Sequence, residues 1–123
     1  MPDTLKQIAI RFLQLAACGD VDAAFENVAD DFVHHNPHFA SDSASLRKAM
    51  AENALMHPDK RFEVLRALEE GDLVVVHSRA HLTADGPDIA LAHLFRFADL
   101  QIAELWDIGQ PAPEHMANQA GMF

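Results

Sequence analysis

Four strand-like runs joined by short turns fill the second half of the chain, and this arrangement limits the possible folds more than any other feature. The runs share an apolar, β-branched composition and cover residues 61–69, 73–83, 89–97 and 102–108. Gly71 and the segment 84–88 supply turn residues between them. Because sequential strands joined by tight turns pair in antiparallel fashion, we expect an antiparallel sheet.

Three helices are expected before this sheet. Apolar residues recur at helical spacing in three segments, which cover residues 5–16, 20–28 and 42–57. Gly19 and Pro58 stand where the first and third helices should end. Helices that precede an antiparallel sheet predict an α+β fold, and a sheet curved around a helix layer can enclose a cavity. No repeat or linker divides residues 1–123, so we expect one domain.

Charge and composition exclude several classes of function. The formal net charge of −10 disfavours binding to nucleic acid or to an anionic membrane surface. Cys18 is the one cysteine, so no internal disulfide can form, which fits a reducing compartment. No apolar run approaches the roughly 20 residues of a membrane helix, and the N-terminus does not resemble a secretory signal. We therefore expect a cytoplasmic protein.

Two polar residues interrupt the last two apolar runs. His93 lies within residues 89–97 and Asp107 within residues 102–108. Burying such groups is costly, so they are either hydrogen-bonded structural groups or groups kept for proton chemistry. A three-residue loop, residues 99–101, would place the two side chains opposite each other, whereas a two-residue loop would put them on opposite faces of the sheet.

If the two side chains meet, Asp107 becomes a candidate general base and His93 its partner. The neighbourhood would be apolar, because Phe95 and Leu105 share the faces of His93 and Asp107. The alternative is a buried Asp–His hydrogen bond that only joins two strands.

A cluster of three histidines lies earlier in the chain, at His34, His35 and His38. Neutral imidazole is a common metal ligand. However, His34 and His35 should point to opposite faces of a strand, and no further ligand follows at a recognised spacing. We therefore expect no metal at these histidines, and we expect one of them at the mouth of the cavity.

Four segments together resemble SnoaL-like polyketide cyclases of the nuclear transport factor 2-like superfamily. They are Phe32–Pro37, Glu70–His77, Leu94–Phe97 and Glu104–Pro111. The resemblance implies a cone-shaped α+β fold with a deep pocket, in which Asp107 is the general base and His93 assists. It also implies that His35, which precedes Asn-Pro, lies at the pocket wall. The family usually carries glycine in the turn where this chain has Leu100.

These observations lead to one expected function and one alternative. We expect cofactor-free acid/base chemistry next to a carbonyl group, by aldol cyclisation, isomerisation or elimination, on a small apolar carbonyl compound. The pocket should be lined by His35, Phe12, Phe95, Leu105 and Trp106. The chain has no tyrosine, which argues against the ketosteroid isomerase mechanism of this superfamily. The alternative is a non-catalytic domain that binds a small ligand.

An exposed sheet face predicts the oligomeric state. His77, Arg79 and His81 alternate with the apolar residues Val76 and Ala80, so the strand 73–83 has one polar and one apolar face. In a fold of this shape one face of the sheet is left uncovered by helices. Because such a face can pack against its twin, we expect a homodimer.

Overall fold

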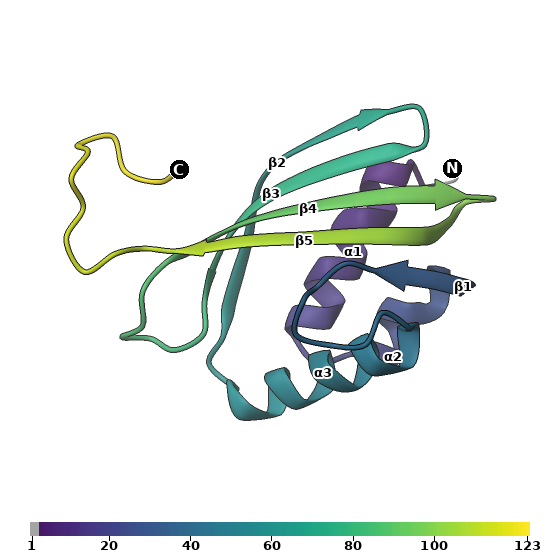
Figure 1. Cartoon of the computed structure of the whole chain (residues 1–123), viewed down its shortest axis with the longest axis horizontal. Coiled ribbons are helices and arrows are strands. Elements are labelled where there is room, and N and C mark those ends of the chain that lie inside the picture. The colour runs from purple at the N-terminus through teal and green to yellow at the C-terminus, as the bar shows by residue number, and fades with distance from the viewer. Residues whose placement is uncertain (1–2) are drawn as a thin grey trace.

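The helices gather against one side of a long, curved sheet (Figure 1). The computed structural model describes residues 3–123. Its elements, in chain order, are α1 (Leu5–Ala17), α2 (Val21–Ala24), a 3-10 turn η1 (Phe25–Asn27), β1 (Val28–His34), α3 (Ser43–Met56), β2 (Arg61–Glu70), β3 (Leu73–His81), β4 (Ile89–Ala98) and β5 (Gln101–Pro111). This arrangement confirms the predicted α+β class.

The sheet is mixed, whereas the sequence analysis predicted a purely antiparallel one. Its strand order is β1-β5-β4-β3-β2. The strands β2 to β5 pair in antiparallel fashion, as their tight turns require. The strand β1 pairs in parallel with β5, with His34 beside Leu105. The long connection through α3 and three strands allows this parallel pairing, which a tight turn could not.

Helix α1 supplies most of the apolar surface that faces the sheet. It begins with a capping box, in which the Thr4 side chain accepts from the backbone N–H of Gln7 and the Gln7 side chain accepts from the backbone N–H of Thr4. Its buried face is regular and comprises Ile8, Ala9, Phe12, Leu13 and Ala16. The chain leaves the helix at Gly19, whose φ of +90° favours glycine.

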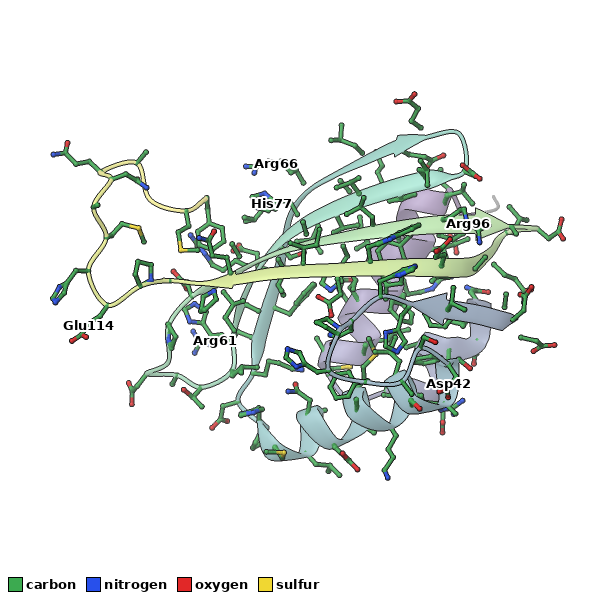
Figure 2. The ribbon with its side chains drawn as sticks, in the orientation of Figure 1. Asp42, Arg61, Arg66, His77, Arg96 and Glu114 are labelled. Atoms are coloured by element: carbon green, nitrogen blue, oxygen red, sulfur yellow. The ribbon has the colours of Figure 1, made fainter. Side chains whose placement is uncertain are left out.

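Helix α3 is capped at its N-terminus and buries little of its surface. Asp42 precedes it (Figure 2) and accepts hydrogen bonds from the backbone N–H and the hydroxyl of Ser45. These bonds lower the pKa of Asp42. Only Leu46 is fully buried among its residues. The rest of its inner face is therefore free to border a cavity.

The core lies between α1 and the middle of the sheet. Phe12 packs edge-on against Phe95, with ring centroids 5.9 Å apart. The largest fully buried side chains are Phe12, Phe95, Ile102, Leu105, Val74, Val76 and Ser78. Val74 and Val76 point into this core, so the uncovered face of β3 carries Val75, His77 and Arg79 instead.

The face of the sheet without helices, which we call the outer face, is covered in part by the C-terminal segment, at β3. The ring of Phe123 stacks on His77 and lies 4.1 Å from the guanidinium carbon of Arg79. Figure 2 shows His77 close to Arg66, whose guanidinium pairs with the His77 ring. Among residues 3–123, no helix combines the length and the apolar character needed to cross a bilayer.

Candidate active site

His93 and Asp107 face each other across β4 and β5 as directly paired residues. Nε2 of His93 lies 3.6 Å from Oδ1 of Asp107, which is longer than a hydrogen bond. The second carboxylate oxygen, Oδ2, accepts a hydrogen bond of 2.8 Å from Nδ2 of Asn36. The carboxylate is thus held from one side by an amide and approached from the other by an imidazole, with 27% of its side chain exposed.

The pairing of His93 with Asp107 arises from a turn and a bulge together. The loop has two residues, Asp99 and Leu100, both at positive φ (51° and 65°), as in the twisted turns of tight hairpins. Of the two loop lengths that the sequence left open, the structure therefore has the shorter one. The register then shifts between the pairs Arg96–Glu104 and Phe97–Ile102, which leaves Ala103 as the extra residue of a β-bulge. This insertion restores the register that a two-residue loop alone would have lost.

Asn36 owes its orientation to the loop after β1. Its side-chain oxygen accepts from the backbone N–H of His38 at 2.9 Å, which leaves the amide nitrogen to point at Asp107. Its backbone N–H donates to Nδ1 of His34 at 3.1 Å, and Nε2 of that ring donates to the carbonyl of Ala40 at 2.6 Å. His34 is therefore a buried organiser of the loop, only 2% exposed. Asn36 was not predicted as a site residue, although it lies in the His-Asn-Pro segment that resembles the family.

A cavity of about 270 Å³ opens beside this pair, between the sheet and helices α1 and α3. Asp107, His93 and Asn36 all border it. Its other polar groups are Asn53 and Lys60. The remaining walls are apolar and include Leu13, Ala16, Phe39, Leu46, Met50, Phe62, Leu82, Ile89 and Leu91. A few polar groups in a mainly apolar hollow are typical of a small-molecule site.

The other predicted pocket residues lie elsewhere. Phe12, Phe95 and Leu105 are at most 2% exposed and belong to the core next to the cavity, not to its lining. Trp106 points to the outer face, where it stacks on His35 at 5.0 Å with the rings nearly parallel. His35 therefore lies across the sheet from the cavity, because adjacent residues of a strand face opposite sides.

His35 takes part in a second polar group on that outer side. Its Nε2 lies 2.6 Å from Oε2 of Glu104, and Arg96 donates to the other carboxylate oxygen at 3.0 Å. The bonds from His35 and Arg96 lower the pKa of Glu104. Among residues 3–123, no three His, Cys, Asp or Glu side chains are grouped so as to hold a metal ion.

Burial decides the charge state of His93. The imidazole is 7% exposed, and burial lowers its pKa, while the Asp107 carboxylate partly offsets this effect. The ring is therefore neutral at neutral pH. Nε2 is the ring nitrogen that faces the Asp107 carboxylate. The other ring nitrogen, Nδ1, has no hydrogen-bond partner among the described residues.

Comparison with known proteins assigns the chain to a family. A family model for the SnoaL-like domain matches residues 9–105. The chain belongs to this family. No curated protein matches the sequence.

Solved structures similar to this SnoaL-like protein share its fold at low identity. AclR of Streptomyces galilaeus, described as a candidate hydroxylase, has a TM-score of 0.74 and 21% identity over 86% of this chain and 88% of its own. A SnoaL-like protein of unknown function from Burkholderia thailandensis has a TM-score of 0.70 and 22% identity over 91% and 100%. A candidate polyketide cyclase from Sinorhizobium meliloti has a TM-score of 0.71 and 21% identity over 88% and 95%. Other neighbours are described as NTF2-like. At these identities the neighbours show the fold alone.

Proposed function

We propose that this SnoaL-like protein is a small-molecule enzyme that removes a proton from carbon next to a carbonyl group, with Asp107 as the general base. One observation carries the proposal: a partly exposed carboxylate, positioned by Asn36 and beside the neutral imidazole of His93, borders a mainly apolar cavity. A carboxylate within reach of a bound ligand can take a proton from carbon as a general base. The chain shares its fold with a candidate polyketide cyclase, so the fold is compatible with this class of reaction.

The proposed reaction balances without a cofactor. An oxygen of Asp107 takes the proton, and the electron pair of the broken C–H bond forms an enolate. In an aldol closure the enolate carbon attacks a second carbonyl of the same substrate and forms the new C–C bond. The resulting alkoxide takes the proton back from the Asp107 carboxyl group, which regenerates the base. In an isomerisation the proton returns to a different carbon.

His93 acts as a positioning residue in this scheme. Its Nε2 lies 3.6 Å from Oδ1, so a small movement brings a neutral N–H donor into hydrogen-bond range of the carboxylate. A neutral donor on Oδ1 would fix the orientation of the Asp107 carboxylate in the cavity. Asn36 contributes a second neutral donor on the other oxygen.

A second candidate function follows from the same contacts. The bond from Asn36 ties the loop after β1 to β5, and the His93–Asp107 pair lies across two strands. These contacts would also suit a domain that only binds a small ligand, with Asp107 in a structural role. The neighbour of unknown function from Burkholderia thailandensis is compatible with either role.

Proton exchange at carbon distinguishes the two functions without knowledge of the natural substrate. The probe is 2-tetralone, a small apolar ketone, incubated with the protein in D₂O and followed by NMR. A catalyst should speed deuterium uptake at the carbon next to the carbonyl, and Asp107→Asn should abolish this gain. Asp88→Asn is the matched control, because Asp88 pairs with His81 at 2.6 Å outside the cavity. Binding of the ketone without any gain in exchange would favour the binding domain.

A further inference from the structure

Lys60 places a cation at the cavity wall away from Asp107. It stands directly before β2, after the turn that follows α3, and its side chain borders the cavity. Its Nζ donates to the side-chain oxygen of Asn53, a residue of α3 that borders the same cavity. No carboxylate within residues 3–123 lies within ion-pair distance of Lys60.

The Lys60 ammonium has one hydrogen-bond partner among residues 3–123, the side chain of Asn53. An ammonium group has three donors, and one amide oxygen accepts from only one of them. Burial lowers the pKa of Lys60 from its ordinary value of 10.5, as expected for a charge beside apolar walls such as Phe62 and Leu46. An anionic group inside the cavity would offset this desolvation.

The polar groups of the cavity therefore form two separate sites. Asp107, His93 and Asn36 form one, on β5, β4 and the loop after β1. Lys60 and Asn53 form the other, at the junction of α3 and β2, and the strand order separates β5 from β2 by two intervening strands. Apolar side chains such as Leu13 and Leu91 border the same space. This arrangement matches an elongated ligand that is polar at both ends.

We propose that the cavity selects a carbonyl compound that also carries a carboxylate, and that Lys60 and Asn53 bind this carboxylate. The inference rests on the proposed function only in taking the Asp107 end as the reacting end. The ammonium of Lys60 pairs with one carboxylate oxygen, and the amide nitrogen of Asn53 is available as a further donor. The substrate is then anchored at one end while its acidic carbon faces Asp107.

Binding of two matched probes tests the anchor independently of turnover. The probes are 2-naphthylacetate and 2-naphthylacetamide, which differ in charge and hardly in shape, and their affinities are measured by isothermal titration calorimetry. The wild-type protein should bind the acetate at least about tenfold more tightly, as a charged hydrogen bond provides. The overall net charge of −10 repels anions, so a preference for the acetate would have to come from a positive group at the binding site.

Three variants assign the preference to Lys60. Lys60→Met should bind the two probes equally, and Lys60→Arg should keep part of the preference. Lys48→Met is the matched control, because Lys48 lies on α3 with a side chain 78% exposed and its loss changes the net charge equally. That control should keep the full preference. In the wild-type protein the preference should also weaken as the pH rises, because Lys60 loses its proton. Since burial lowers the pKa of Lys60, this loss should begin at a lower pH than for an exposed lysine.

The outcomes separate this inference from the proposed function. A wild-type protein that binds the acetate no more tightly than the amide contradicts the carboxylate site, whether or not either probe binds. An equal loss of preference in Lys60→Met and Lys48→Met also contradicts it. Asp107→Asn should keep or increase the preference for the acetate, because it removes a negative charge from the same cavity. A preserved preference combined with no proton exchange by the wild type would uphold the Lys60 site and reject Asp107 as a base.

Discussion

Asp107 on β5 lies directly opposite His93 on β4, with Oδ1 and Nε2 3.6 Å apart. The two residues meet because Ala103 forms a β-bulge in β5, between the hairpin turn and Asp107. One inserted residue thus decides which face of the sheet the carboxylate occupies. Without it, a two-residue turn would direct Asp107 to the outer face, away from the cavity. The candidate site depends on backbone geometry about four residues from the carboxylate.

The turn itself carries backbone strain that a glycine would relieve. Leu100 has φ of 65°, a left-handed conformation that costs a non-glycine residue about 1–2 kcal/mol. Its side chain is 65% exposed, so little packing is lost on truncation. After the entropy cost of glycine, Leu100→Gly should raise the free energy of unfolding by about 0.5–1 kcal/mol, measured by urea denaturation.

The control for this change is Leu68→Gly. Leu68 is 69% exposed within β2 and has an ordinary strand conformation. Glycine should destabilise the protein there by about 1 kcal/mol, because it weakens a strand interior. Equal destabilisation by both substitutions would refute the strain at Leu100.

The pH dependence of stability should report on His93. Burial lowers its pKa below the ordinary 6.5, so the unfolded chain binds a proton before the native state does. Its contribution to stability should be complete above pH 6.5 and be lost as the pH falls from 6.5 to the lowered pKa of the folded protein. His93→Phe should flatten this part of the stability curve, as measured by denaturation between pH 8 and pH 5.

The partner charge adds a second check on His93. The Asp107 carboxylate raises the pKa of His93 against the larger effect of burial. In Asp107→Asn the imidazole pKa, followed by NMR titration, should therefore fall further. A His93 pKa above 6.5 in the wild type would contradict the lowering by burial, and one above 7 would mean a mostly charged ring at neutral pH, contrary to the proposed scheme.

We expect the protein to form a homodimer through the outer face of the sheet. This face carries Ile108, which is 60% exposed, and the half-buried Trp106. Exposed apolar side chains on one face of an antiparallel sheet favour packing against a second copy. Light scattering at micromolar concentration should give twice the chain mass of 13.6 kDa.

A charge on the exposed apolar part of β5 tests the surface involved. Ile108→Glu should shift the protein toward monomer, whereas Leu55→Glu, on the 83% exposed Leu55 of α3, should leave the dimer intact. A wild-type protein that is monomeric at micromolar concentration would exclude the predicted assembly.

Elemental analysis of the purified protein should find no stoichiometric transition metal, and activity should survive chelation. Both ring nitrogens of His34 already bond to backbone groups of Asn36 and Ala40. Nε2 of His35 bonds to Glu104 on the outer face. A near-equimolar metal that disappears on substitution of His35 or His38 would contradict a cofactor-free mechanism.

Local signals in the sequence were sufficient for the helices and the class of fold. Helical spacing and Gly19 predicted α1 almost to its end, and the turn residues separated the four antiparallel strands. The parallel partner of β1 could not be predicted, because pairing between segments about 70 residues apart leaves no local pattern. The bulge at Ala103 was equally hidden, since no glycine or proline marks it.

The residues of the candidate site were predictable in part. Alternation along β4 and β5 put His93 on the face of Phe95 and Asp107 on the face of Leu105. It could neither fix the register between the two strands nor separate the core from the cavity. Phe95 and Leu105 share that face and are packed in the core. Lys60 was missed because a lysine before a strand ordinarily faces water, and only the position of α3 turns it toward the cavity.

The central claim is that Asp107 is a base held in the cavity at some cost to the fold. Asp107→Asn keeps the shape and removes the charge. If Asp107 is kept for chemistry, the melting temperature should stay unchanged or rise, because active sites often carry groups that do not stabilise the fold.

The most direct measurement compares the wild type with Asp107→Asn in two quantities, the rate of proton exchange on 2-tetralone and the free energy of unfolding. For each protein, both quantities are measured on the same preparation. The account predicts a fall in catalysed exchange of at least roughly a hundredfold with stability equal or higher. A loss of about 1–3 kcal/mol in stability with exchange intact would contradict it, because that result is expected of a purely structural hydrogen bond.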